Sequence, residues 1–346
     1  MSQPAVFIEV NPFHAVTLFP LHASLSTSPR DVVLGHARLF GQELFDEIQA
    51  PKEPFSVRRL VRFILGHRVR RCYFNTINFT LTPITGETTR LNALTLLLPF
   101  LTRMLGCRNS AVVHEADQFF ATGIDSCRRH AWFRRAIGRW FIRLFDERFV
   151  LAPEVADFLT ARGIDVRLLD CRSLVTFASP PSPTAIAAGC SSHVLLSWIG
   201  PIVSHRRNWR ALVELTAAEL DALRASFVML CDSRVGEGQE LRAAVRERGL
   251  EQHFIFLDAR PDDRELFSSV DRSTAVVCLY GGPEYGTTKT SGARLIASAF
   301  RKPFIATNPS LGVYDHEGAQ IAAIPTLRGC IERIAQLPDT LTRSLL

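Results

Sequence analysis

The sequence predicts an α/β protein with two Rossmann-like, doubly wound domains that face each other across a cleft. Short apolar runs alternate with longer segments of helical spacing along the whole chain. This alternation is typical of mainly parallel sheets that helices cover on both faces. The chain has 346 residues, which is too many for one ordinary core and fits two domains in series.

Six short apolar runs predict the strands of the first domain. They span residues 5–10, 31–37, 71–77, 110–116, 148–152 and 166–170. Between them, apolar residues recur at helical spacing and predict helices over 88–105, 128–146 and 153–162. Because strands and helices take turns, we expect a mainly parallel sheet.

A break in this rhythm marks the domain boundary. Residues 173–192 are rich in serine, proline and alanine and have no clean period, which is typical of a linker. The domains are therefore predicted over 1–172 and 193–346. In the second domain the predicted strands span 193–200, 226–232, 253–259, 275–280 and 303–308, and the predicted helices 207–224, 238–248, 262–270, 291–301 and 326–336.

Composition narrows the functional class. The formal net charge of +6 suits phosphate-bearing ligands, nucleic acid and an anionic membrane surface alike. The eight cysteines include no pair at C-x-x-C spacing, so we expect reduced, buried thiols and no zinc site in a cytoplasmic protein. We also expect no signal peptide and no transmembrane span. No zinc-finger spacing or RNP-type motif points to a nucleic-acid partner.

A polar turn in the second domain is the first candidate binding site. "TTKTSG" (287–292) stands between a predicted strand and a predicted helix. Ser291 or Thr290 fits the N-cap, and Gly292 leaves the first helical turn open to close approach. Free N–H groups, the helix dipole and Lys289 together favour a phosphate. An ordinary capped helix after a glycine-containing loop explains the same residues.

The stretch 193–308 carries a resemblance to a known family. "LLSWIGPIVSHRRNWRALVEL" has a hydrophobic strand ending in glycine and then basic residues. "HFIFLDARPDDRELFSSVDRSTAVVCLY" and "PEYGTTKTSGARLIASAFRKPFIATN" follow, the latter with an E-x-x-G loop and a K-P-hydrophobic strand. In order and spacing these blocks resemble the C-terminal, nucleotide-sugar-binding domain of GT-B glycosyltransferases, most closely family 4.

The resemblance implies that a sugar moves from a nucleotide diphosphate-sugar to an acceptor. It also implies a retaining hexosyltransferase that needs no metal and no cofactor besides its nucleotide-sugar co-substrate. The donor-binding residues that it implies are Gly200, Arg206, Arg207, Glu284, Thr288, Lys289, Thr290, Ser291 and Gly292. A planar guanidinium at Arg206 or Arg207 suits bidentate binding of a diphosphate.

The sequence departs from the family at two acidic positions. The family carries a glutamate seven residues before the strand-opening proline, and another acid eight residues earlier; here these positions hold Ile296 and Thr288. Glu284 lies four residues before the second position. Loss of a charged hydrogen-bond acceptor weakens binding by about 1.5–3 kcal/mol. A catalytically inactive GT-B protein with a binding or regulatory role is therefore the alternative function.

His114 is the candidate catalytic residue of the first domain. It ends the strand in "AVVHEADQFF" (111–120), followed by Glu115 and Asp117. Family 4 enzymes often contact the donor sugar through a histidine at this position, which is the role that the resemblance implies. Without the resemblance, a histidine at a strand end is more often structural, because it can form hydrogen bonds with nearby backbone groups. Asn11 and His14 are weaker candidates in the first strand–helix turn.

A basic, aromatic segment suggests a membrane partner. "RRHAWFRRAIGRWFIRLF" (128–145) predicts an apolar stripe through Trp132, Trp140 and Phe141, with arginines on its other faces. This composition suits the headgroups of an anionic leaflet. An acceptor that is lipid-linked or a cell-surface polysaccharide precursor fits such a protein, peripheral on the inner face of the cytoplasmic membrane. An ordinary amphipathic helix packed on the sheet is the other interpretation.

Overall fold

The computed structural model describes residues 3–10, 15–77, 97–120, 131–177, 194–204, 206–281, 285, 291–307 and 311–338; of residues 118 and 131–134 it describes the backbone alone. These residues fall into two compact units, which meet in sequence between Ser173 and Leu174. Most of the predicted linker, residues 178–192, lies outside the described part of the chain.

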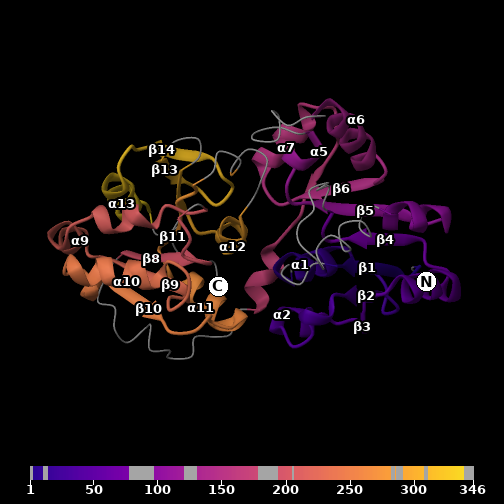
Figure 1. Ribbon diagram of the computed structural model, residues 1–346, viewed down its shortest axis with the longest axis horizontal. Coiled ribbons are helices and arrows are strands. Elements are labelled where there is room, and N and C mark those ends of the chain that lie inside the picture. Colours follow the sequence, from indigo (N-terminus) through magenta and orange to yellow (C-terminus); the bar gives the residue numbers. More distant parts are fainter. Residues whose placement is uncertain are drawn as a thin grey trace. The chain divides into compact units, whose positions relative to one another are not determined.

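Unit 1 is built on a parallel sheet of seven strands in the order β3-β2-β1-β4-β5-β6-β7 (Figure 1). All six predicted strands are present, as β1, β2, β4, β5, β6 and β7. The strands are β1 (Ala5–Glu9), β2 (Val32–Gly35), β3 (Lys52–Pro54), β4 (Arg71–Phe74), β5 (Arg108–Val113), β6 (Glu147–Val150) and β7 (Arg167–Leu168).

Helices cover both faces of this sheet because successive side chains of each strand point to opposite sides. Val6 and Ile8 of β1 belong to one buried core cluster, together with Leu60 of α3 and Phe141 of α6. Phe7 points the other way and lies 4.8 Å, between ring centroids, from His22 of α1. The helices are α1 (Ala15–Leu25), α2 (Glu43–Asp46), α3 (Val57–His67), a helix over 97–104, α5 (Asp117–Phe120), α6 (Ala131–Ile142) and α7 (Pro153–Thr160), with the 3-10 helices η1 (Ala37–Leu39) and η3 (Arg172–Phe177).

Unit 2 repeats this plan with a sheet in the order β10-β9-β8-β11-β12-β13-β14. The strands β8 to β12 are mutually parallel and correspond to the five predicted strands, whereas β13 and β14 are antiparallel and were not predicted. The strands are β8 (Val194–Ile199), β9 (Ala225–Asp232), β10 (Phe254–Leu257), β11 (Ala275–Cys278), β12 (Phe304–Thr307), β13 (Leu311–Tyr314) and β14 (Gln320–Ala323).

The single helix predicted over 207–224 is wrong, because the segment divides at Thr216. Thr216 is the N-cap of α9 and forms a reciprocal capping box with Glu219, which starts a new helix at that point. The helices of unit 2 are η4 (Trp209–Glu214), α9 (Ala217–Leu223), α10 (Gly238–Glu247), η5 (Glu251–His253), α11 (Asp263–Arg272), α12 (Gly292–Ala299) and α13 (Leu327–Ala335).

The cysteines within the described residues agree with the reduced state that the sequence predicts. Each of them is buried and free: Cys72, Cys107, Cys171, Cys231, Cys278 and Cys330. In the part of the chain that the structure covers, none of the helices combines the length and apolar character needed to cross a bilayer.

Candidate functional site

The carboxyl edge of the unit 2 sheet has the topology of a ligand site. From β8 the chain adds β9 and then β10 on one side, and afterwards crosses to add β11 and β12 on the other. The loops that follow β8 and β11 therefore leave the sheet in opposite directions. In open α/β sheets this is the point at which ligands bind.

Gly200 directly follows β8 and has a conformation that few other residues adopt, with φ of 90°. A Cβ atom placed on Gly200 would lie 3.1 Å from Nη1 of Arg207. The missing side chain thus leaves room for the guanidinium above the end of β8. Two residues that the sequence predicts for the donor site are brought together here.

The loop after β8 is fixed to the segment that follows β11 by backbone contacts. Arg207 and Tyr280 form an isolated antiparallel bridge. On either side of it, the N–H of Asn208 donates to the carbonyl of Leu279 at 2.9 Å, and the N–H of Gly281 donates to the carbonyl of Arg206 at 2.9 Å. Arg206 itself is exposed. The bridge holds Arg207 across the switch point between the two strands.

Among the described residues, the guanidinium of Arg207 has no acidic partner. Within the described residues its Nη1 atom is buried and has no hydrogen-bond partner. Burial raises the pKa of Cys231 to about 12 and that of Cys278 to about 11, although the charge of Arg207 opposes both rises. These two thiols are therefore uncharged at neutral pH, and the guanidinium lies 5.9 Å from the ring of Trp198. A buried guanidinium nitrogen without an acceptor is costly, so an anionic ligand that supplies one would be favoured here.

The start of α12 adjoins this position through Tyr280. Ser291 is the N-cap, as predicted, and its hydroxyl accepts a hydrogen bond from the N–H of Arg294 at 3.2 Å. The Tyr280 hydroxyl lies 2.7 Å from the same Ser291 oxygen. Gly292 is exposed, and a Cβ added there would have no atom within 4 Å. No described residue therefore covers Gly292 in the first turn of α12. Glu284, Thr288, Lys289 and Thr290 lie outside the described residues.

Glu237, which the sequence analysis missed, clamps the loop that carries Arg207. Its carboxylate accepts hydrogen bonds from the Ser204 N–H at 2.9 Å, the Ser204 hydroxyl at 2.8 Å and Nε1 of Trp209 at 2.6 Å. The Trp209 bond, followed by the backbone bond from Ser204, lowers the pKa of Glu237 from 4.5 to about 2. Glu237 thus ties residues on both sides of Arg207 to the loop before α10.

This clamp predicts a defined loss of stability in acid. Because the folded pKa is depressed, the stabilisation is fully present above about pH 4.5 and is lost as the pH falls towards 2. We expect Glu237→Gln to melt at a lower temperature than wild type at pH 7, with the difference shrinking at pH 3. Thermal melts of both proteins across this range measure it. A difference that stays constant with pH would contradict the role of the Glu237 charge.

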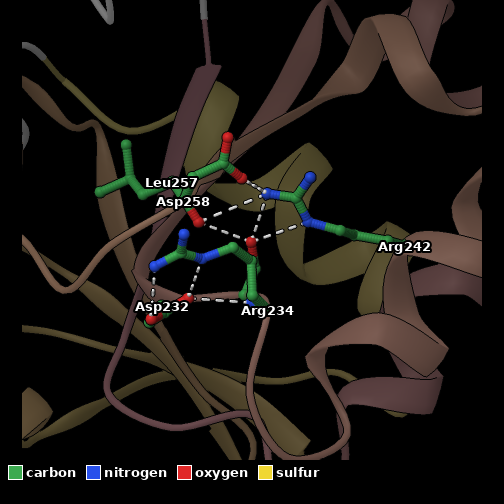
Figure 2. A network of polar contacts seen from close by, with 6 residues as sticks. Asp232, Arg234, Arg242, Leu257 and Asp258 are labelled. Carbon is green, nitrogen blue, oxygen red and sulfur yellow. Dashed lines mark hydrogen bonds and ion pairs between the residues drawn. The ribbon is translucent and has the colours of Figure 1, made fainter.

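A second polar network ties the carboxyl ends of β9 and β10 together, as Figure 2 shows. Arg242 of α10 donates to the Ser233 hydroxyl at 2.8 Å and also contacts Asp258. Arg234 donates through Nε to Asp232 at 3.1 Å, and this pair lowers the pKa of Asp232. These charges are paired with one another, in contrast to Arg207.

Ile296, in place of the family's glutamate, is packed inside unit 2. Only 4% of its surface is exposed, and it lies in the middle of α12. The position therefore offers an apolar side chain to the core and no acceptor for a ribose hydroxyl. The structure thus supplies no carboxylate at position 296, where the sequence departs from the family.

In unit 1, His114 follows the last residue of β5, where the sequence places it. Its Nε2 lies 2.7 Å from the backbone oxygen of Asn75. Asp117 does not continue the strand, since α5 begins there.

A nearby acid, Glu9, was missed by the sequence analysis and is fully buried. The sequence feature that could have identified Glu9 is a single carboxylate in the otherwise apolar strand "AVFIEV" (5–10).

No family model matches this chain, and no curated protein matches it significantly. Solved structures do match. An Anabaena HepE in complex with UDP is 14% identical with a TM-score of 0.57, over 88% of this chain and 80% of that chain. The sucrose-phosphate synthase of Thermosynechococcus elongatus is 14% identical with a TM-score of 0.55, over 99% and 92%.

A UDP-N-acetylglucosamine 2-epimerase is also similar, with 10% identity and a TM-score of 0.52 over 97% of this chain and 87% of that chain. Identities of this size establish the fold and not the activity. The two sheets of this chain, each with seven mainly parallel strands, match the two-domain architecture of these proteins. The chain therefore has the GT-B fold of two Rossmann-like domains, as its sequence predicts.

Proposed function

We propose that the chain is a glycosyltransferase whose unit 2 binds a nucleotide diphosphate-sugar. The observation that carries this proposal is the half-buried guanidinium of Arg207 at the carboxyl edge of the sheet, whose Nη1 atom is buried and has no hydrogen-bond partner among the described residues. It lies between a glycine-ended strand and, through Tyr280, the open start of α12. A diphosphate supplies the negative charge that this position lacks.

The proposed catalytic task is to stabilise the departing nucleoside diphosphate. Negative charge grows on it as the glycosidic bond breaks, and fixed donors aimed at that charge lower the barrier. Arg207 and the N–H groups of Gly292 and Ala293 are such donors. Arg206, Glu284, Thr288, Lys289 and Thr290 complete the proposed donor site, and His114 is proposed to contact the transferred sugar. Retention of anomeric configuration and transfer of a hexose are further proposals that rest on the family resemblance.

A binding protein without turnover is the second candidate, and the burial of Ile296 favours it. Without the family glutamate, the ribose loses a charged acceptor. The two candidates share the anion site and differ in chemistry. The fold also occurs in an epimerase, so the products must be identified directly.

The test is a panel of nucleotides and sugar nucleotides. We expect UDP, GDP or dTDP, or one of their sugar conjugates, to raise the melting temperature of the chain. The responding conjugate is then incubated with the protein, and its products are separated. Free nucleotide diphosphate with the sugar moved to water or an acceptor supports a transferase. Binding without any product supports the binding protein, an isomerised sugar nucleotide supports an epimerase, and no response from any compound rejects the anion site.

We further propose that unit 1 docks on an anionic membrane through an aromatic–basic surface, defined as Leu97, Met104, Trp140, Arg135, Arg139 and Arg143. Three large apolar side chains there are exposed by 64% (Leu97), 86% (Met104) and 54% (Trp140). The rings of Phe100 and Trp140 lie 5.1 Å apart, which places the helix over 97–104 beside α6. The three arginines are also exposed. Trp140, Arg135 and Arg139 lie on α6, and Arg143 directly follows it. Exposed apolar side chains and cations on one helix suit a headgroup region.

The surface differs in part from the predicted stripe. Phe141 lies in the core of unit 1, so it is unavailable to a membrane, whereas Trp140 is turned outwards. The side chains of Trp132 and Phe133 lie outside the description of the structure. An acceptor carried by a lipid, at the cytoplasmic face of a membrane, fits this proposal.

A further inference from the structure

Unit 1 has its own switch point, between β1 and β4, and a buried acid stands there. β1 leads to β2 and β3 on one side, and the chain then crosses to β4 on the other. Glu9 is the last residue of β1 and is 0% exposed. Its carboxylate accepts hydrogen bonds from the side-chain amide of Asn75 and, at 2.7 Å, from the hydroxyl of Thr76.

These two donors fix the segment that follows β4. The N–H of Asn75 donates to the carbonyl of Ile8 at 2.9 Å, and its side-chain amide also reaches the Thr17 hydroxyl of α1 at 2.9 Å. Asn75 is thus held through its backbone and through its side chain. Its remaining backbone group, the carbonyl, has a defined direction.

That carbonyl is the partner of His114. Its oxygen lies 2.7 Å from Nε2 of the ring. A carbonyl oxygen only accepts hydrogen bonds, so Nε2 must carry the proton. In the neutral ring, Nδ1 is then the acceptor. Any hydrogen bond that neutral His114 accepts from a sugar hydroxyl comes through Nδ1.

A carboxylate at position 9 has lost its hydration, because Glu9 is 0% exposed. The strand around it is otherwise apolar, and burial of a charge is tolerated only with good donors. Both donors named above belong to residues 75 and 76, beside the His114 contact. The acid therefore acts on the segment that orients the histidine ring.

We propose that Glu9 is a positioning residue, which fixes Asn75 and Thr76 and thereby the orientation and the Nε2–H tautomer of His114. The consequence for turnover rests on the proposed function, in which His114 contacts the transferred sugar. The effect of Glu9 on the orientation and tautomer of the His114 ring does not depend on the proposed function. An experiment can therefore reject the positioning role of Glu9 without rejecting the proposed function, and the reverse.

The experiment reads the ring nitrogens of His114 by NMR in the full chain with labelled histidine, assigned with His114→Gln. Wild type is expected to give the signature of a single Nε2–H tautomer. In Glu9→Gln, which keeps the shape and removes the charge, we expect that signature to be lost and both ring nitrogens to show averaged shifts. Where a sugar nucleotide is turned over, kcat falls by up to about a hundredfold, while nucleotide affinity of unit 2 is unchanged.

Asp31→Asn is the matched control. Asp31 is also a buried acid, and its carboxylate accepts hydrogen bonds from the Ala5 N–H at 2.7 Å and the Ser26 hydroxyl at 2.8 Å, at the opposite end of β1. Loss of the Asp31 charge destabilises the same unit without removing a contact of Asn75. Ser26→Ala removes one of the hydrogen bonds to Asp31 and is a milder control. If Glu9→Gln does not fold, Thr76→Val removes one donor and should shift the ring in the same direction. An unchanged ring in the Glu9 or Thr76 variant, or the same change in the controls, overturns the proposal.

Discussion

Arg207→Met is expected to lose nucleotide binding while the folded chain becomes no less stable. The guanidinium is half-buried and has a buried Nη1 without a partner among the described residues. The free protein therefore loses no side-chain hydrogen bond there and is relieved of a partly desolvated charge, which offsets the lost contact with the Trp198 ring. The bound nucleotide loses at least one charged hydrogen bond, worth about 1.5–3 kcal/mol, which corresponds to a fall in affinity of roughly tenfold to more than a hundredfold. Calorimetric titration and thermal melts measure the two effects separately.

Two variants define the specificity of this result. Arg207→Lys keeps the charge and loses the planar fork, so its affinity should lie between those of wild type and Arg207→Met. Arg246→Met is the control for net charge, because Arg246 lies in the last turn of α10, away from the carboxyl edge of the sheet. Nucleotide affinity in Arg207→Met equal to that of wild type would rule out Arg207 as the diphosphate ligand.

The second large effect is expected at the aromatic–basic surface. A double variant, Met104→Glu with Trp140→Glu, should no longer float with vesicles that contain an anionic lipid. Both side chains are more than half exposed, so the change places charge in the headgroup layer and does not empty the core. Replacement of Arg135, Arg139 or Arg143 by glutamine should weaken the association by about fivefold each, since each cation near such a surface contributes about 1 kcal/mol. Added salt should weaken it further.

Leu168→Glu is the control for this experiment. Leu168 is an equally exposed apolar residue of unit 1, but it lies on β7 and outside the aromatic–basic surface. It should float as wild type does. Wild-type protein that binds neutral and anionic vesicles equally, or ignores both, contradicts the proposed docking surface.

The parallel strands were predictable because burial on both faces leaves an almost unbroken apolar run. "AVVC" in β11 is the plainest case, with all four residues buried. β3 could not be found this way, because Lys52, Glu53 and Pro54 are partly exposed and polar or cyclic. The helix break at Thr216 depends on a capping box, which a periodic apolar pattern does not reveal.

Some residues of the candidate site were predictable from the sequence, and others were not. Gly200, Arg207 and Ser291 could be selected as candidates because glycine, arginine and an N-cap serine stand at fixed offsets from strands and helices. Tyr280 and Glu237 were missed, since their importance lies in contacts between loops that are distant in sequence. Glu9 gave a signal, a charge inside a strand, but its partners are 66 and 67 residues away. Only the fold brings such residues together.

The contact between Arg207 and Trp198 gives the protein a built-in optical reporter. The guanidinium lies 5.9 Å from the indole, and the energy of the indole excited state responds to nearby charge. An anion that neutralises Arg207 changes the field across that ring, so the emission of Trp198 should shift in wavelength as the site fills. Occupancy can thus be followed by fluorescence with an unlabelled ligand.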